Sequence, residues 1–153
     1  MILQLTVGAL VSAINIGIHA LVTVVAVAIA RGAGHRRTGR PRLQLMAVMV
    51  ATAAVLEVAH ALEVLVWAWT YHIVQAAAPG SDLLYFAFVN YTTLGYGDIT
   101  PVREWRLIGP LTAMNGVLLF GWSAAILFEV LRKTLDYVGL IKDDFIPGRG
   151  SEP

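Results

Sequence analysis

Three long apolar stretches occupy most of this chain and constrain its fold more than any other feature. The first runs from Ile2 to Ala30 without a charged residue, the second from Leu43 to Ala78, and the third from about Trp105 to Leu131. A helix needs about 20 apolar residues to cross the hydrocarbon core of a bilayer, and each stretch meets that length. The sequence therefore predicts three transmembrane helices. A cleaved signal peptide is the alternative for the first stretch, but no basic segment precedes it and it is longer than a usual signal core.

The composition excludes most soluble functions. Of the 153 residues, 58% are hydrophobic and 14% are charged, and none is cysteine. An ordinary soluble domain carries about 25% charged residues, so this chain is too poor in charge to cover itself in water. Soluble enzymes, nucleic-acid-binding proteins and disordered segments are disfavoured, and disulfide bonds and thiolate metal sites are ruled out. No nucleophile and base stand together outside the lipid-level residues, so we expect neither an enzyme nor a cofactor.

The basic residues are distributed unevenly between the two sides of the membrane. Five of the 11 Lys and Arg residues lie in residues 31–42, and only Arg103 and Arg106 lie on the other side of the membrane from them. The remaining four follow the third stretch: Arg132, Lys133, Lys142 and Arg149. Cytoplasmic segments carry the excess of Lys and Arg, which predicts an external N-terminus and a cytoplasmic C-terminus.

Between the second and third stretches the sequence indicates a segment that enters the membrane and turns back. A break at residues 78–82, rich in Pro, Gly, Ser and Asp, is followed by a short apolar segment from Leu83 to Thr92. About ten residues cannot span a bilayer as a helix. The next residues, Thr93 to Asp98, read TLGYGD and are too rich in glycine for a regular helix. Such backbone is tolerated at membrane depth only inside protein or along a water-filled path.

The segment from Thr92 to Asp98 closely resembles the selectivity filter of potassium channels, whose loop reads TVGYG in each of four subunits. Leu94 stands where that family most often has valine. The resemblance covers about residues 43–133, and the first apolar stretch is additional to a minimal two-helix pore. The resemblance implies an all-α membrane protein with three transmembrane helices, a re-entrant pore helix and a filter loop, assembled as a four-fold symmetric tetramer.

The resemblance also divides the chain into segments. These are an N-terminal transmembrane helix (1–30), a cytoplasmic basic loop (31–42), a pore domain (43–133) and a short cytoplasmic tail (134–153). Within the pore domain they are an outer helix (43–75), a pore helix (81–92), a filter (93–98) and an inner helix (105–133). The compact pore suggests a prokaryotic plasma membrane.

The chemistry of a potassium filter explains why this motif needs its glycines. A potassium ion in the pore must exchange its hydration shell for other oxygens, which one extended strand supplies as backbone carbonyls. Directing these carbonyls to one axis requires alternate residues in conformations that glycine adopts at little cost, which suits Gly95 and Gly97. The implied ligands are the carbonyls of Thr93, Leu94, Gly95 and Tyr96. One chain cannot close a ring of carbonyls, so the motif implies a homotetramer in a lipid bilayer.

Five neighbouring residues are expected to support the filter. In the family, the aspartate at the Asp98 position bonds to an aromatic residue of the pore helix. Here Tyr85 can donate such a hydrogen bond and Phe86 cannot. Val89 stands where some relatives carry a glutamate that pairs with the aspartate, and Thr92 directly precedes the filter.

The inner helix offers candidates for a gate. Gly116 and Gly121 resemble the glycine hinge of two-helix potassium channels, while the alternative is that they permit close helix packing. Glu129 would form an acidic ring at the inner mouth, but an ion pair to Lys133 one turn later is the favoured interpretation. No helix carries regularly spaced arginines, so a voltage sensor is not expected. A proton, lipid, membrane tension or a separate regulatory subunit remain as stimuli.

Five polar residues lie inside the apolar stretches and should face protein or water. Glu57 and His60 share a face of the second stretch, Glu63 follows one turn later, and Asn15 and His19 of the first stretch lie at similar heights. The favoured interpretation is a polar seam that docks the first helix onto the pore. A proton sensor built on His60 and Glu57 is the second, because histidine titrates near pH 6.5. A divalent-metal site is the third.

The leading functional hypothesis is a passive, potassium-selective channel without a voltage sensor. A weakly selective cation channel is the first alternative, since Leu94 and Phe86 would loosen the filter. A proton-coupled carrier that uses the polar cluster, and a non-conducting subunit of a larger assembly, are the others.

Overall fold

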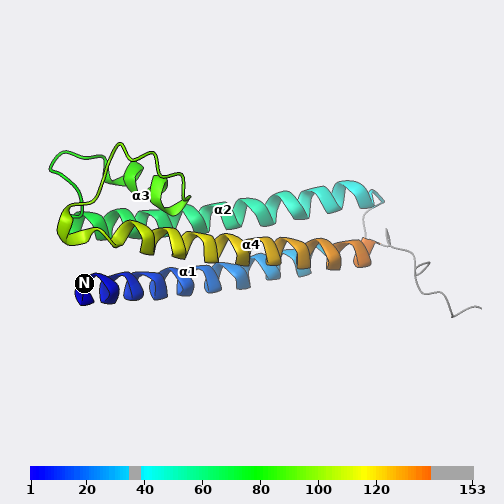
Figure 1. The fold of residues 1–153 in the computed structure, drawn as a ribbon. Helices are drawn as coiled ribbons and strands as arrows, with labels where there is room; N and C mark the ends of the chain where they lie inside the picture. The colour runs from blue at the N-terminus through cyan, green and yellow to red at the C-terminus, as the bar shows by residue number, and fades with distance from the viewer. Residues whose placement is uncertain (35–38, 139–153) are drawn as a thin grey trace, which may run out of the picture.

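The computed structural model describes residues 1–34 and 39–138. Three long helices lie side by side, and a short fourth helix packs at one end of the group (Figure 1). They are α1 (Ile2–Gly34), α2 (Pro41–Ile73), α3 (Leu83–Tyr91) and α4 (Ile108–Val138), with a single 3-10 turn at Arg103–Trp105. The described residues form no β-strand.

The predicted all-α membrane architecture is confirmed. The segments Ile2–Gly32, Pro41–Ile73 and Arg103–Tyr137 are each long and apolar enough to cross a membrane. The N-terminus lies at the same end of the molecule as α3, α2 returns in the opposite direction, and α4 runs parallel to α1 (Figure 1). Each of the three long helices packs against the other two, and α3 packs against α2 and α4.

Both ends of the predicted basic loop and the start of the predicted tail are corrected by the structure. α1 continues to Gly34 rather than ending at 30, and α4 continues to Val138 rather than 133. Arginine and lysine side chains can extend their charged ends toward water, so a helix need not stop where its apolar stretch stops. α2 begins at Pro41, where a proline without an amide proton is tolerated in the first turn. The rest of the predicted loop and tail, residues 35–38 and 139–153, lies outside the described residues.

Next to the glycine-rich loop, the helix ends lie inside the predicted bounds. α3 spans Leu83–Tyr91 instead of 81–92, because the Asp82 carboxylate accepts a hydrogen bond from the Tyr85 amide at 3.0 Å and caps the helix. α2 ends at Ile73 instead of 75, and Gln75 adopts a left-handed φ of 52°. α4 begins at Ile108 instead of 105, since the chain first makes the 3-10 turn.

The apolar core has two parts along the long axis. Near α3, it is formed by aromatic side chains such as Trp67, Tyr71 and Phe86, which are nearly inaccessible to solvent. The Tyr71 and Phe86 rings lie 5.1 Å apart between centroids. Toward the other end, Leu56 and Ile126 belong to a second, smaller cluster. Aromatic packing between Tyr71 and Phe86 therefore holds α3 against α2.

α1 and α4 are in contact near α3 but leave a space between them at the opposite end. The Leu107 amide donates to the Gln4 side-chain oxygen at 2.9 Å, and Gly8 makes room for the Leu111 side chain. At the far end lies a cavity of about 240 Å³. Its lining includes Val27 and Ala30 of α1 and Trp122, Ile126 and Val130 of α4.

Gly116 sits where α4 passes closest to α3. A Cβ built on this residue would overlap the carbonyl oxygen of Tyr91 and lie 3.0 Å from its carbonyl carbon. At Gly121, no atom lies within 4 Å of the corresponding position. The geometry therefore gives Gly116 a packing role, whereas a hinge at either glycine stays a prediction.

Replacement of Gly116 by alanine should destabilise the protein by about 1–3 kcal/mol, because the added methyl group displaces the end of α3. Thermal unfolding of the purified chain in detergent measures this effect. Gly121→Ala is the matched control and should leave the midpoint nearly unchanged. Equal midpoints for the two variants would show that the contact at Gly116 is not needed.

Candidate functional site

The glycine-rich loop begins as a direct continuation of α3. The amide of Thr93 donates to the Asn90 carbonyl at 3.0 Å. The amides of Leu94 and Gly95 both donate to the Val89 carbonyl, at 3.0 and 3.4 Å. Three successive amides thus bond to the last turn of α3, so the position of α3 sets the position of the loop.

The loop backbone alternates between ordinary and left-handed residues. Thr93, Gly95 and Gly97 have φ values of 61°, 60° and 77°. This conformation was expected for the two glycines but not for Thr93. A β-branched residue rarely adopts a positive φ, so the sequence carried no signal for it. Strained backbone of this kind is concentrated at functional sites.

The side chains of the loop divide into exposed and anchored groups. Leu94 and Tyr96 are 55% and 67% exposed in the single chain. The Thr92 hydroxyl donates to the Phe88 carbonyl at 2.7 Å and stays with α3. Leu94 and Tyr96, the two large side chains of the loop, therefore lie on the surface of the single chain.

Asp98 is held at the outer end of the loop by the tyrosine that the sequence analysis singled out. The Tyr85 hydroxyl donates to Asp98 Oδ2 at 2.7 Å, and the Ile99 amide donates to Oδ1 at 3.1 Å. Phe86 points into the core, where it is 2% exposed, and Val89 is also buried. The hydrogen bond to the Asp98 carboxylate, and its negative charge, raise the pKa of Tyr85 above the usual 10.0.

At the far end of α4, Glu129 forms ion pairs with two basic neighbours. Its carboxylate lies 2.9 Å from Arg132 and 3.0 Å from Lys133. The ion pair to Lys133 agrees with the interpretation favoured from the sequence, whereas the contact with Arg132 was not expected. Both oxygens face cations, which leaves the carboxylate less suited to an acidic ring.

The polar residues inside the membrane do meet, but around Glu63 rather than Glu57. Glu57 is exposed, and no hydrogen bond or ion pair is found for it within the described part of the chain. Six residues separate the two glutamates, which places them about 120° apart around a helix of 3.6 residues per turn. Glu63 faces the other helices and is fully buried, whereas Glu57 is exposed.

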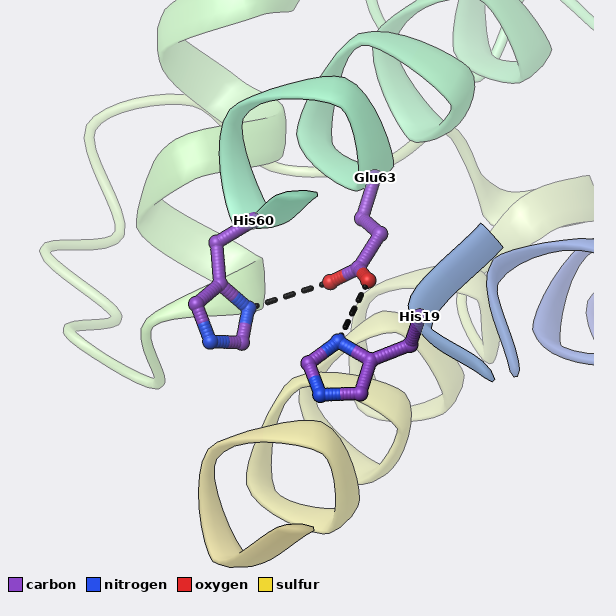
Figure 2. Close-up of side chains that lie close together, drawn as sticks. All are labelled: His19, His60 and Glu63. Atoms are coloured by element: carbon purple, nitrogen blue, oxygen red, sulfur yellow. Dashed lines mark hydrogen bonds and ion pairs between the residues drawn. The ribbon is translucent and has the colours of Figure 1, made fainter. Parts of the chain in front are cut away.

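The Glu63 carboxylate lies between two imidazole rings (Figure 2). His19 of α1 approaches Oε1 through its Nδ1 atom at 2.9 Å, and His60 of α2 approaches Oε2 through Nδ1 at 3.0 Å. The third partner is the Tyr91 hydroxyl of α3, which donates a short hydrogen bond to Oε2. His19 is fully buried, and the His60 side chain is 18% exposed.

Ser123 of α4 closes the cluster from the other side. Its Oγ lies 2.9 Å from Nε2 of His60 and 3.3 Å from Nε2 of His19. Neither Ser123 nor Tyr91 was predicted from the sequence as part of this cluster. A serine in an apolar helix was a visible signal, but the tyrosine was indistinguishable from its aromatic neighbours. The cluster of His19, His60, Glu63, Tyr91 and Ser123 is called the four-helix cluster below.

Asn15 makes a separate polar connection between α1 and the other helices. Its side-chain amide donates to the Glu63 backbone carbonyl at 3.2 Å and to Asn115 Oδ1 at 3.0 Å. The Trp67 indole donates to the same Asn115 oxygen at 2.9 Å. Together with the four-helix cluster, these contacts form the polar seam expected between α1 and the pore helices.

The bond between Tyr85 and Asp98 predicts an alkaline limit to stability. The folded protein raises the pKa of Tyr85, so the stabilisation is complete below pH 10 and is lost as pH rises through the higher, folded value. Thermal unfolding followed between pH 8 and pH 12 should show this loss in the wild type and a smaller one in Tyr85→Phe. The variant Asp98→Asn keeps an acceptor without charge and should lose stability at lower pH than the wild type. Identical pH profiles for wild type and Tyr85→Phe would contradict the assignment.

Comparison with known proteins places this arrangement in a family. Residues 59–133 match a family model described as "Ion channel". No curated protein and no solved structure matches the chain. The matched segment begins in α2, contains α3 and the glycine-rich loop, and ends in α4, whereas α1 precedes it. Residues 59–133 therefore carry the two-helix pore domain of the ion-channel family, and a helix that is long and apolar enough to cross a membrane precedes them.

Proposed function

We propose that the protein is a potassium-selective channel that conducts passively as a homotetramer. One observation carries the proposal: left-handed backbone recurs at alternate residues 93, 95 and 97 directly after α3. Carbonyls that replace the hydration shell of potassium must turn toward one axis, and this alternation is the backbone pattern that supports it. Leu94 and Tyr96, between the left-handed residues, then brace the strand from behind.

A homotetramer follows from the incompleteness of one chain. A single strand offers one carbonyl at each level, whereas a dehydrated potassium ion needs a ring of them. Apolar side chains on α3 and α4 are exposed in the single chain, among them Phe88 at 44%, Val117 at 57% and Leu118 at 56%. Surfaces of this kind suit contact with lipid or with further copies of the chain.

The charge distribution supports one orientation in the membrane. The N-terminus and the filter share one end of the molecule, and the arginines that flank residues 35–38 lie at the other (Figure 1). The positive-inside rule then places the filter outside and the C-terminal end of α4 in the cytoplasm. In this orientation, the negative end of the α3 dipole points inward and favours a cation there.

One observation favours weak selectivity as the second candidate function. Phe86 is buried against Tyr71 and has no group that can donate a hydrogen bond to the filter. The filter then relies on the single contact between Tyr85 and Asp98 for its outer brace. Fewer braces would permit the ring of carbonyls to adapt to sodium.

The reversal potential of the purified protein in a planar bilayer tests selectivity directly. With potassium on one side and sodium on the other, we expect reversal near the potassium equilibrium potential. Reversal near zero with clear single-channel steps would establish the weakly selective channel instead. Saturable flux that stops without a proton gradient would overturn both and indicate a carrier.

Replacement of Gly97 by alanine should abolish selective conduction. The residue has a φ of 77°, where a side chain costs about 1–2 kcal/mol in each of the assembled chains. Bilayer recordings should show loss of current or of discrimination between potassium and sodium. Gly17→Ala is the control, since no atom lies within 4 Å of the added Cβ. Unaltered selectivity in Gly97→Ala would contradict the role of the alternating backbone.

A further inference from the structure

The four-helix cluster uses every nitrogen of its two histidines. Both imidazoles direct Nδ1 at the Glu63 carboxylate and Nε2 at the Ser123 hydroxyl. The four distances lie between 2.9 and 3.3 Å. His19 and Glu63 are fully buried, and Ser123 is 7% exposed. These rings are therefore fixed in orientation by contacts on both sides.

A count of hydrogens shows that the cluster has one too few for its hydrogen bonds. The four contacts of the ring nitrogens with Glu63 and Ser123 each need one hydrogen between their two atoms, and the His60 Nδ1 hydrogen can be shared with the Tyr91 oxygen at 2.9 Å. Two neutral imidazoles supply two hydrogens and the Ser123 hydroxyl supplies one, while the ionised carboxylate supplies none. The Tyr91 hydrogen is already directed at Glu63. With neutral rings, two acceptor atoms therefore face each other without a hydrogen in one of these contacts. The contact is buried, where an unmade hydrogen bond is costly.

A metal ion between the Nδ1 atoms and the carboxylate removes this deficit. Both imidazoles then carry their hydrogen on Nε2 and donate it to Ser123, whose oxygen has two lone pairs to accept them. Both Nδ1 lone pairs face the ion. This arrangement is typical of metal-binding histidines, which donate their second nitrogen to a fixed acceptor.

We propose that His19, His60 and Glu63 form a binding site for a divalent transition-metal ion of the zinc class. Their ligand atoms lie within 4.8 Å of one another. Two imidazole nitrogens and one carboxylate are a set that zinc accepts in tetrahedral sites. The Tyr91 oxygen lies 2.9 Å from Nδ1 of His60 and is in place as a fourth ligand.

A groove gives the site a route to the exterior of the single chain. Its volume is about 390 Å³, and it is lined by His60 and Tyr91 together with Phe88, Thr92 and Phe120. The exposed carboxylate of Glu57 forms part of the same wall. An anionic group beside the route attracts a cation toward His60. Glu57, which is not part of the four-helix cluster, would have this role.

The ion would connect α1 and α2 to the end of α3. Tyr91 is the last residue of α3, and Thr93 begins the left-handed alternation two residues later. Occupancy would thus reduce the movement available to the base of the loop. The binding site itself does not depend on the proposed potassium selectivity, so binding is tested apart from current.

Cobalt serves as the probe, because its visible absorption bands report coordination number. The full-length chain, purified without a polyhistidine tag and treated with EDTA, is titrated with Co²⁺ in detergent. We expect one ion per chain, absorption typical of a four-coordinate site, and displacement by Zn²⁺. Failure to bind, or absorption typical of six-coordinate aqueous cobalt, would overturn the proposal.

Variants assign the ligands. His19→Gln, His60→Gln and Glu63→Gln should each weaken Co²⁺ binding more than 100-fold, and Ser123→Ala about 10- to 100-fold through the loss of ring orientation. The matched control is His72→Gln, since His72 is an exposed histidine on α2 outside the cluster. Binding that survives in the three ligand variants and disappears in His72→Gln would overturn the assignment.

Two further measurements keep the proposal falsifiable. If the ligand variants do not fold, X-ray absorption at the metal edge of the wild-type protein should show two imidazole ligands, and their absence would overturn it. The missing charge would instead be a proton if the metal-free protein binds no Co²⁺ and shows a pH-dependent unfolding midpoint that His60→Gln abolishes. That outcome replaces the metal by a proton and excludes the proposed site.

Discussion

One buried carboxylate determines how the four helices of this protein come together. Glu63 lies within the membrane-spanning part of α2, where an ion without partners is expensive. α1 supplies His19 and α3 supplies Tyr91, while α4 supplies Ser123, which fixes both imidazoles. A helix that moved away from this point would leave a polar group without a partner in an apolar environment. The additional helix α1 is thereby attached by the same residue that holds the end of α3.

The glycine-rich loop depends on this arrangement through α3. Its first three amides bond to carbonyls of Val89 and Asn90, so the loop moves with the last turn of the helix. That turn is confined between Glu63 on one side and Gly116 on the other. Asp82 caps the opposite end, and Tyr85 fixes the outer end of the loop. Strained backbone at Thr93 persists because its surroundings leave it no freedom to relax.

The sequence predicted what local patterns determine. Apolar length gave the three spanning helices, the short segment before TLGYGD gave α3, and the need for a donor selected Tyr85 over Phe86. What depends on tertiary contacts was missed or misplaced. The rotation of α2 about its own axis determines that Glu63, rather than Glu57, is buried. The hydrophobic pattern of the sequence does not distinguish these two residues. Tyr91 and Thr93 gave no local signal, and the helix ends depend on where charged side chains reach water.

α4 packs against α1 closely in its first half and less closely in its second half. Near the glycine-rich loop, Gln4 of α1 accepts a hydrogen bond from the amide of Leu107, just before α4, and Asn15 of α1 donates one to Asn115 of α4. Toward the other end, a cavity of about 240 Å³ is lined by residues of both helices, while Ile126 and Val130 of α4 pack with Leu56 of α2. The second half of α4 is therefore packed on its α2 side and borders open space on its α1 side. Movement of the last turns of α4 toward α1 would therefore meet less packed protein than the same movement beside the glycine-rich loop.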